Sequence, residues 1–445
     1  MTTANLTPHK KLGLTARIFI GMAIGIAIGT LLQLLSDDSG DFSFSVFNTE
    51  FSTYAFLVEG IFTILGTLFI KALKMLVVPL VFVSLVCGTA NLSDPSKLGR
   101  LGGKAVGLYI GTTAIAISLA IVFALIVQPG SGIDLASDST YTAKQAPSLA
   151  QVIIDMMPSN PVDAMAQGNM LQIIVFAAFF GIALAMVKGE SGSRLRTFFD
   201  DLNEVIMRIV TIVMNLAPYG VFALMAKLAA TTDIEVFQGL TKYFFLVLFV
   251  LFIHALVTYP IILKLFSGLN PITLLKKMRD TAIFAFSTAS SSATLPVTIE
   301  TANKKLGVKN SVASFTLSLG STVNMDGTAI MQGVATVFIA QVYNVDLSVT
   351  DFLMVILTAT LASIGTAGVP GVGLLMLAMV LQQVNLPVEG IALIIGVDRL
   401  LDMTRTAVNV TGDCVVSCIV AKSENEIDLA VYNNPNAGSK YEELP

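Results

Sequence analysis

The sequence predicts an all-α polytopic membrane protein with eight transmembrane helices and two re-entrant helical hairpins that are related as inverted repeats. First, 54% of the 445 residues are hydrophobic and only 13% are charged, about half of the roughly 25% that soluble domains carry. Second, apolar runs such as Ile18–Leu35 and Tyr243–Phe266 reach the length of about 20 residues that crosses a bilayer as helix. Third, basic and acidic connections alternate between these runs. A soluble protein is therefore excluded.

Composition argues against several other classes of protein. The net charge is −4 without a basic stripe, which speaks against nucleic-acid binding. Cys87, Cys414 and Cys418 lie in or beside apolar segments and form no CxxC pair, so we expect them to pack as small apolar residues. The only histidine inside an apolar run is His254. Because no acidic residue is near it in sequence, we expect a helix-packing role in preference to a proton relay.

The charges of the connections predict how the chain is oriented. We interpret the basic N-terminus and the long first run as a retained first span and not as a signal peptide. Basic clusters face the cytoplasm under the positive-inside rule, which places both termini there, in an inner (plasma) membrane. The basic clusters are Lys10–Arg17, Lys97–Lys104, Lys188–Arg196, Lys276–Arg279 and Lys304–Lys309, and the acidic connections are Ser36–Glu50, Asp233–Glu235, Asn344–Asp351 and Asn385–Glu389.

Two apolar pieces fit this alternation only if each enters and leaves on one side. Thr281–Glu300 lies between two basic clusters, and Phe352–Val384 lies between two acidic connections. Small residues and a proline interrupt each centre, at Ser290–Pro296 and Gly365–Gly371, and we expect them to break the helix there. The pattern predicts hairpin 1 at about 275–302 and hairpin 2 at about 350–384, an inverted repeat typical of secondary transporters. Two kinked packing helices are the alternative, but they leave the charge alternation unexplained.

The last apolar run, Ile391–Val420, carries a polar stripe. At about 100° per residue its main polar side chains fall within an arc of about 80°; they are Asp398, Asp402, Arg405, Asn409 and Asp413. One charge at the bilayer centre costs at least ~2.5–3.5 kcal/mol, so this face is expected to look into a protein-lined, wet or ion-filled space. The alternative is a salt-bridged seam with Asp402 paired to Arg405. Arg399 lies about 100° away, and we expect it to pair with a neighbouring helix.

The preceding apolar run is interrupted by the segment TVNMDGT, residues 322–328. Asp326 followed by Gly327 predicts local unwinding of a helix that otherwise extends from about Val312 to Val342. Unwinding would direct Asn324, Asp326 and free carbonyls toward a small hard cation, because oxygen-only ligands suit such ions. The segment therefore predicts a cation site of the kind that Na⁺ occupies.

Four segments carry a resemblance to a known family. In chain order they are SSSATLPVT, NMDGTA, SIGTAGVPGVG and DMTRTAVNVTGD, and KMLVVPLVF precedes them. Together they resemble the signature of the glutamate transporter family of dicarboxylate/amino acid:cation symporters, over about residues 10–420. The resemblance implies a homotrimer in which a transport domain slides through the membrane in an elevator movement and hairpin 2 is the extracellular gate.

The resemblance also implies the domain boundaries. A single membrane domain covers 12–421, with a scaffold at about 12–95 and 150–230 and a transport domain at about 100–128 and 238–421. Cytoplasmic tails cover 1–11 and 422–445, and we expect the polar tail Ser423–Pro445 to be disordered.

Site residues follow from the same resemblance. Asp402 would hold a substrate amino group and Arg405 a side-chain carboxylate, and the other substrate-binding positions are Ser291, Thr328, Val369, Gly373, Thr406 and Asn409. The first cation site would use Gly320, Asn324, Asn409 and Asp413. The second would use carbonyls of Thr322, Ser363, Ile364 and Thr366. The third would use Tyr109, Thr112, Thr113, Asn324 and Asp326.

The residue types predict an acidic amino acid as substrate. A planar guanidinium binds a carboxylate bidentately, and the Asp402 carboxylate beside it suits an ammonium group. We therefore predict a secondary active symporter for L-aspartate or L-glutamate, with Na⁺ as the co-transported ion and the lipid bilayer and other copies of the chain as partners. Gln332 stands where animal members carry a glutamate tied to proton and potassium coupling, and its carboxamide cannot titrate. The alternatives are a proton-coupled symporter of the same amino acids or of C4-dicarboxylates, or an anion-conducting channel. An intramembrane serine protease would need a base beside Ser291, so we predict no enzyme.

Overall fold

The computed structural model describes residues 14–39, 43–46, 49–52, 54–92, 95–133, 154, 157–231, 234–364, 368 and 370–438. These residues pack as two compact units. Unit 1 contains the described residues of 1–73 and 210–233, and unit 2 contains those of 74–209 and 234–445. The predicted division into a scaffold and a transport domain stays a prediction.

Unit 1 is built around the helix pair α1 (Leu14–Ser39) and α8 (Ala217–Thr231). Three glycines one turn apart let the two backbones meet: a Cβ on Gly25 would lie 2.5 Å from the Phe222 carbonyl oxygen, and Gly21 and Gly29 are equally close to α8. The π-helix η1 (Ala55–Phe62) packs on the same helix, with the Phe62 ring edge-on to Phe222. Unit 1 also takes the first turns of α2 (Thr63–Leu92) and the end of α7 (Gly189–Asn215).

Unit 1 also contains a short pair of strands. Strands β1 (Ser43–Val46) and β2 (Thr49–Ser52) form an antiparallel hairpin with Phe44 opposite Phe51. The predicted helical fold class is confirmed, and the hairpin is a small local addition to it. In SFSV, polar and apolar residues alternate with the period of a strand.

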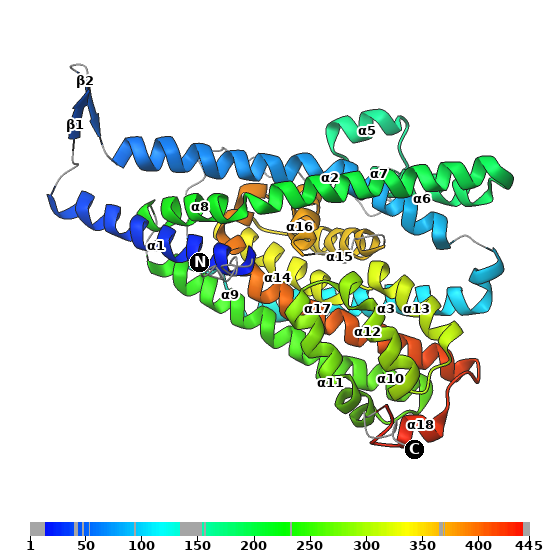
Figure 1. Ribbon diagram of the computed structural model, residues 1–445. Helices are drawn as coiled ribbons and strands as arrows, with labels where there is room; N and C mark the ends of the chain where they lie inside the picture. The colour runs from blue at the N-terminus through cyan, green and yellow to red at the C-terminus, as the bar shows by residue number, and fades with distance from the viewer. Residues whose placement is uncertain are drawn as a thin grey trace, which may run out of the picture. The chain divides into compact units, whose positions relative to one another are not determined.

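Unit 2 holds the remaining helices (Figure 1). They are the rest of α2 and α7, α3 (Pro95–Val127), α5 (Pro161–Gln167), α6 (Met170–Met186), α9 (Ile234–Ile253), η2 (His254–Thr258), α10 (Tyr259–Ser267), α11 (Pro271–Thr288), α12 (Ser291–Glu300), η3 (Thr301–Lys305), α13 (Asn310–Val323), α14 (Asp326–Val342), α15 (Val349–Ser363), α16 (Val372–Gln383), η4 (Val388–Gly390), α17 (Ile391–Ser423) and α18 (Leu429–Asn433).

Several helices are long and apolar enough to cross a membrane, as the sequence predicts. Among the described residues there are four such helices, 16–35, 55–87, 101–127 and 238–267, or five if the bent pair 189–213 and 217–231 is one span. α17 has 33 residues, about 50 Å of helix, but its polar stripe lowers its hydropathy. α13 and α14 are each shortened by the break between them. A total of eight spans therefore stays a prediction.

Hairpin 1 comprises α11, α12 and η3, residues 271–305. Its two limbs fold back on each other. The Thr281 hydroxyl on the first limb lies 2.8 Å from the Thr301 hydroxyl on the second. The helix breaks at Ala289, in the left-handed region at φ 49°, and at Ser290, whose Oγ accepts a hydrogen bond from the Ala293 N–H. Pro296 lies inside α12, so the prediction that the proline breaks this piece is wrong. In this short helix Pro296 removes one bond, the one to the carbonyl of residue 292.

Hairpin 2 comprises α15 and α16, which pack on each other. A capping box at Ser348 and Asp351 starts α15, and Gly371 at φ 85° precedes α16. A left-handed φ of this kind favours glycine. Its limbs are residues 349–363 and 372–383. Entry and exit of each hairpin on the same membrane side stay predictions.

The run from residue 310 to 342 is broken as predicted. α13 ends at Val323, α14 begins at Asp326, and Asn324 and Met325 between them have non-helical backbone angles. The unwound backbone and the Asp326–Gly327 step therefore lie near the start of a buried run, since residues 323–340 are all buried.

The C-terminal segment (residues 424–438) contradicts the prediction of a disordered tail. Ile427 pairs with Val308 in an antiparallel bridge, and α18 buries Tyr432 completely. The tail is polar on average, but Ile427 and Tyr432 attach it to the rest of the chain. The last seven residues of the predicted tail lie outside the described residues.

Candidate functional site

A buried charge cluster on α17 forms the centre of the candidate site. Arg405 is only 1% exposed. Its Nη1 donates to Asp398 Oδ1 at 2.7 Å and its Nη2 to Asp402 Oδ1 at 3.0 Å. All five residues of the predicted stripe are buried, Asn409 and Asp413 included. Their burial agrees with the prediction of a protein-lined space for this face.

Asp402 is held from two directions. Its Oδ2 accepts from the Gly371 N–H at 3.2 Å and from Arg399 Nη1 at 3.3 Å. Arg399 therefore bonds to Asp402 on its own helix, and its predicted pairing with a neighbouring helix stays a prediction. The two positions lie about 60° apart around the helix axis, within reach of the long arginine side chain. Asp398 is a site residue that sequence reasoning placed on the stripe without giving it a role.

The start of α16 closes on the same arginine. A Cβ placed on Gly373 would lie 3.2 Å from Arg405 Nη2 and 3.3 Å from the Thr328 methyl. The structure therefore brings together Gly373, Thr328 and Arg405, three of the predicted substrate-binding positions. Thr406 Oγ1 donates to the Asp402 carbonyl within α17.

The two hairpin tips meet beside this cluster. The Gly368 carbonyl accepts from the Ser292 N–H at 3.2 Å and from Ser290 Oγ at 2.7 Å. Ser291 is buried, and a Cβ on Gly368 would lie 3.1 Å from the Ser291 Cβ. The predicted position Ser291 is thus at the meeting point. Val369 lies outside the described residues.

Asn409 connects the charge cluster to the broken helix. Its Oδ1 accepts from the Gly327 N–H at 2.7 Å. Asn324 donates to the Asn409 carbonyl at 3.2 Å and to Asp413 Oδ1 at 2.9 Å. A Cβ on Gly320 would lie 2.5 Å from the same Asp413 oxygen. The residues predicted for the first cation site are therefore gathered in one place.

Most residues of the third predicted cation site also lie together. Thr113 Oγ1 donates to Asp326 Oδ1 at 2.5 Å, and Thr112 Oγ1 lies 3.5 Å from Asn324 Oδ1. These contacts join α3 to the break between α13 and α14. The Tyr109 hydroxyl donates to the Thr316 carbonyl at 2.9 Å, and its oxygen lies beside Gly320.

The sequence analysis assigned two residues of this region, His254 and Tyr259, to no site. His254 Nε2 lies 3.0 Å from Asp326 Oδ2, and the Tyr259 hydroxyl donates to the same oxygen at 2.9 Å. The expectation that His254 only packs is therefore wrong. It rested on the absence of a nearby acid in sequence, but the acid comes from a position 72 residues later. The one available signal was the polarity of both residues inside an apolar run.

The second predicted cation site is described only in part. Thr322 lies at the end of α13, and Ser363 and Ile364 lie at the end of α15. A Cβ on Gly368 would lie 2.7 Å from the Ser321 carbonyl oxygen, so the hairpin 2 turn reaches this end of α13. Thr366 lies outside the described residues, and the site stays a prediction.

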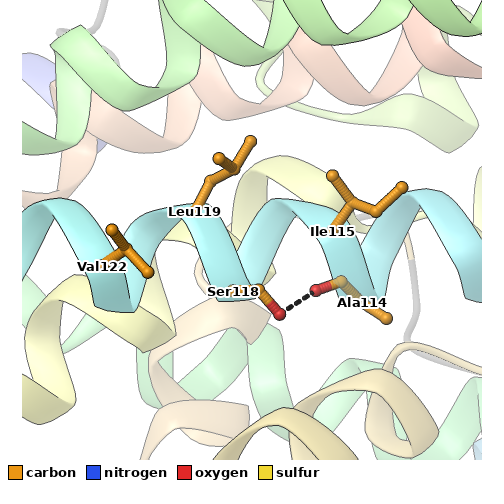
Figure 2. Close-up of a pocket in the computed structure, with 5 residues that line it drawn as sticks. All are labelled: Ala114, Ile115, Ser118, Leu119 and Val122. Carbon is orange, nitrogen blue, oxygen red and sulfur yellow. Dashed lines mark hydrogen bonds between the residues drawn. The ribbon is translucent and has the colours of Figure 1, made fainter.

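An apolar groove on α3 lies apart from these residues. Figure 2 shows its lining on one helix face: Ala114, Ile115, Ser118, Leu119 and Val122. Its volume is about 330 Å³. The Ser118 hydroxyl is bonded to the Ala114 carbonyl at 2.7 Å, so the groove offers no free polar group to a charged substrate, and the candidate site is elsewhere.

Buried charges between broken apolar helices define a membrane transporter as the class of this protein. Comparison with known sequences agrees. Residues 14–423 match the model of the Sodium:dicarboxylate symporter family, and the chain belongs to this family. It is a multi-pass membrane transporter and not an enzyme.

Three relatives illustrate the range of the family. The chain is 36% identical to the proton/glutamate-aspartate symporter of Escherichia coli K12 over 94% of both chains. It is 34% identical to the proton/sodium-glutamate symport protein of Bacillus caldotenax, over 94% of this chain and 96% of the relative. It is 35% identical to a C4-dicarboxylate transport protein of Bacillus subtilis strain 168, over 82% of this chain and 88% of the relative.

Proposed function

We propose that this cation-coupled symporter takes up L-aspartate or L-glutamate together with Na⁺. Family membership and the relatives support cation-coupled symport of glutamate and aspartate or of C4-dicarboxylates. The finer choice of substrate and ion rests on the chemistry of the two buried clusters.

The observation that carries the substrate proposal is the double pairing of Arg405. Its two terminal nitrogens are bonded to carboxylates of its own helix, so an incoming carboxylate of the same geometry replaces a bond that already exists. A substrate that displaces Asp402 from Arg405 frees that carboxylate. An ammonium group on the substrate then supplies its new partner, since a buried carboxylate left without one costs several kcal/mol. An acidic amino acid carries both groups, whereas a C4-dicarboxylate lacks the second.

The cation proposal rests on two buried carboxylates. Asp326 and Asp413 are 0% and 2% exposed. In the described part of the chain their hydrogen bonds go to hydroxyl, amide and imidazole groups, and neither is paired with lysine or arginine. Two negative charges in a region of low dielectric need compensation, and oxygen ligands of this kind suit Na⁺. We propose that sodium supplies it, at the first and third sites.

Proton coupling is the second candidate, because the same carboxylates can be neutralised by protonation. The E. coli relative is named a proton symporter and the B. caldotenax relative a proton/sodium symport protein. Gln332, buried in α14, argues against a titrating group at that position. The alternative substrate is a C4-dicarboxylate, as the name of the B. subtilis relative indicates for that protein.

We further propose the homotrimer, the elevator movement and cytoplasmic termini that the resemblance implies. All candidate site residues belong to unit 2, which also includes both hairpins. Unit 2 also contains residues 74–92 and 157–209, which the resemblance gives to the scaffold, so the proposed movement rests on the resemblance.

Uptake into proteoliposomes tests the function. Labelled L-aspartate, L-glutamate and succinate are offered under an inward Na⁺ gradient and, separately, an inward H⁺ gradient, both at clamped voltage. We expect concentrative uptake of an amino acid with Na⁺ alone. Uptake driven only by protons overturns the sodium proposal and keeps the pocket. Uptake of succinate in preference to both amino acids overturns the role of Asp402.

A further inference from the structure

The C-terminal segment (residues 424–438) is bonded by backbone pairing to residues 307–309, which follow the second limb of hairpin 1. The Lys309 N–H donates to the Glu426 carbonyl at 3.0 Å, and the Asp428 N–H donates to the Gly307 carbonyl at 2.7 Å. Between them lies the Val308–Ile427 bridge. The chain therefore continues past α17, returns to the end of hairpin 1 and pairs with it as a strand would.

Lys277 joins the other limb to the same place. It lies on α11 and is buried, 8% exposed. Its Nζ donates to the Lys305 carbonyl at 2.7 Å, to the Val431 carbonyl at 2.8 Å and to the Tyr432 carbonyl at 2.9 Å. The single ammonium group thus donates three hydrogen bonds, one to η3 at the end of hairpin 1 and two to α18. Such charge-assisted bonds are about twice as strong as neutral ones.

α18 adds a third attachment. The Tyr432 hydroxyl donates to the Asn270 carbonyl at 2.9 Å, at the start of α11. Burial raises the pKa of the Tyr432 phenol, so the hydroxyl keeps its proton for this bond. Lys277 Nζ lies 5.9 Å from the Tyr432 ring centre, within the range of a cation–π contact. Figure 1 shows α18 beside the ends of α10 and α11.

The glycine at the pairing point is required by its geometry. Gly307 has φ +72°, and a Cβ there would lie 2.4 Å from the Asp428 carbonyl oxygen. A side chain would be strained by the backbone angle and would push the C-terminal segment away. Gly268, at the end of α10, has nearly the same φ of +70° but nothing within 4 Å. It offers a matched position without the close approach.

We propose that the C-terminal segment is a strap that locks the base of hairpin 1, with Lys277 as its central clamp. The base is formed by residues 270–281 and 301–309, and every attachment described above falls within it. With the base locked, hairpin 1 moves only as part of unit 2. When the two hairpin tips separate at Gly368, hairpin 2 is therefore the part that moves.

Amide hydrogen exchange by mass spectrometry, on the full-length protein in lipid nanodiscs, tests this device. Lys277→Met keeps the length and apolar stem of the side chain and removes the three donors. We expect exchange of residues 301–309 and 424–434 to rise at least tenfold. Lys276→Met, the exposed neighbour on the same helix, is the control and should leave both segments unchanged.

A second pair of variants keeps the test independent of Lys277. Gly307→Ala should produce the same rise in exchange, and Gly268→Ala should not. Wild-type exchange in residues 301–309 in both Lys277→Met and Gly307→Ala overturns the strap. A rise confined to residues 424–434, with the hairpin base still protected, also overturns it, because the segment is then attached without locking anything. The readout does not depend on the transported substrate, so failure of the uptake experiment leaves the strap to be judged on exchange alone.

Discussion

The two units bury different kinds of surface. In unit 1, α1 lies against α8 through glycines and backbone, and the cluster around Val58 and Phe62 is apolar. In unit 2, the break before Asp326 and the charge cluster around Arg405 are buried together with their hydrogen-bond partners. Close apolar packing has one best arrangement. Buried charges, in contrast, can exchange one partner for another, which a transporter needs. Substitutions should therefore act on stability in unit 1 and on substrate and ion affinity in unit 2.

The largest effect is expected at Arg405. Arg405→Lys retains the charge but loses the planar pair of terminal nitrogens, so one of Asp398 and Asp402 is left without its partner. Breaking a buried charge pair costs about 3–5 kcal/mol, and we expect a loss of more than hundredfold in the ratio of maximal uptake rate to KM. Arg399→Lys is the control on the same helix and should lose less than tenfold. Equal losses in the two variants would contradict the central role of Arg405.

A smaller but more selective effect is expected at Asp402. Asp402→Asn removes the negative charge that would pair with a substrate ammonium group, and a charge-assisted bond of this kind is worth about 1.5–3 kcal/mol. KM for the amino acids should rise about tenfold to hundredfold. Inhibition of uptake by succinate should stay the same or strengthen, because succinate has no ammonium group. A parallel loss for succinate would show that Asp402 only orients Arg405.

The third effect concerns the cation. Thr113→Val keeps the shape of the side chain and removes the hydroxyl that donates to Asp326. The net value of one such bond is about 0.5–1.5 kcal/mol, so the Na⁺ concentration for half-maximal uptake should rise severalfold at unchanged pH. Ser118→Ala, also on α3 but in the groove of Figure 2, is the control. A shift in the proton dependence with no change in the Na⁺ dependence would favour proton coupling.

The smallest effect on transport is expected in unit 1. Gly25→Val places methyl groups where the Phe222 carbonyl oxygen lies, and overpacking of this kind costs about 1–3 kcal/mol. Thermal unfolding should occur at lower temperature while KM for substrate and Na⁺ stays constant. Gly103→Ala, with nothing within 4 Å, should not lower the unfolding temperature. A change in KM for Gly25→Val would break the contrast between the two units.

Sequence periodicity was sufficient for the buried face of α17. A helix has a fixed angle per residue, so the positions of Asp398, Asp402 and Arg405 on one stripe follow from their numbers alone. The break between α13 and α14 was also predictable, because Asp326–Gly327 disfavours a continuous helix in its immediate surroundings. The break between α11 and α12 includes Ser290, in the run of small residues that predicted it, and this signal is local as well.

Tertiary structure decided which distant groups became partners. His254 and Tyr259 bond to Asp326, Lys277 bonds to α18, and the C-terminal segment pairs beside Gly307. Local sequence patterns also failed to predict that the C-terminal segment is ordered and that Pro296 lies inside α12. Local propensity reports on neighbours within a few residues, whereas these contacts join positions separated by roughly 70 to 150 residues. Only folding of the whole unit brings such groups to hydrogen-bonding distance, and burial then makes each bond too costly to leave unmade.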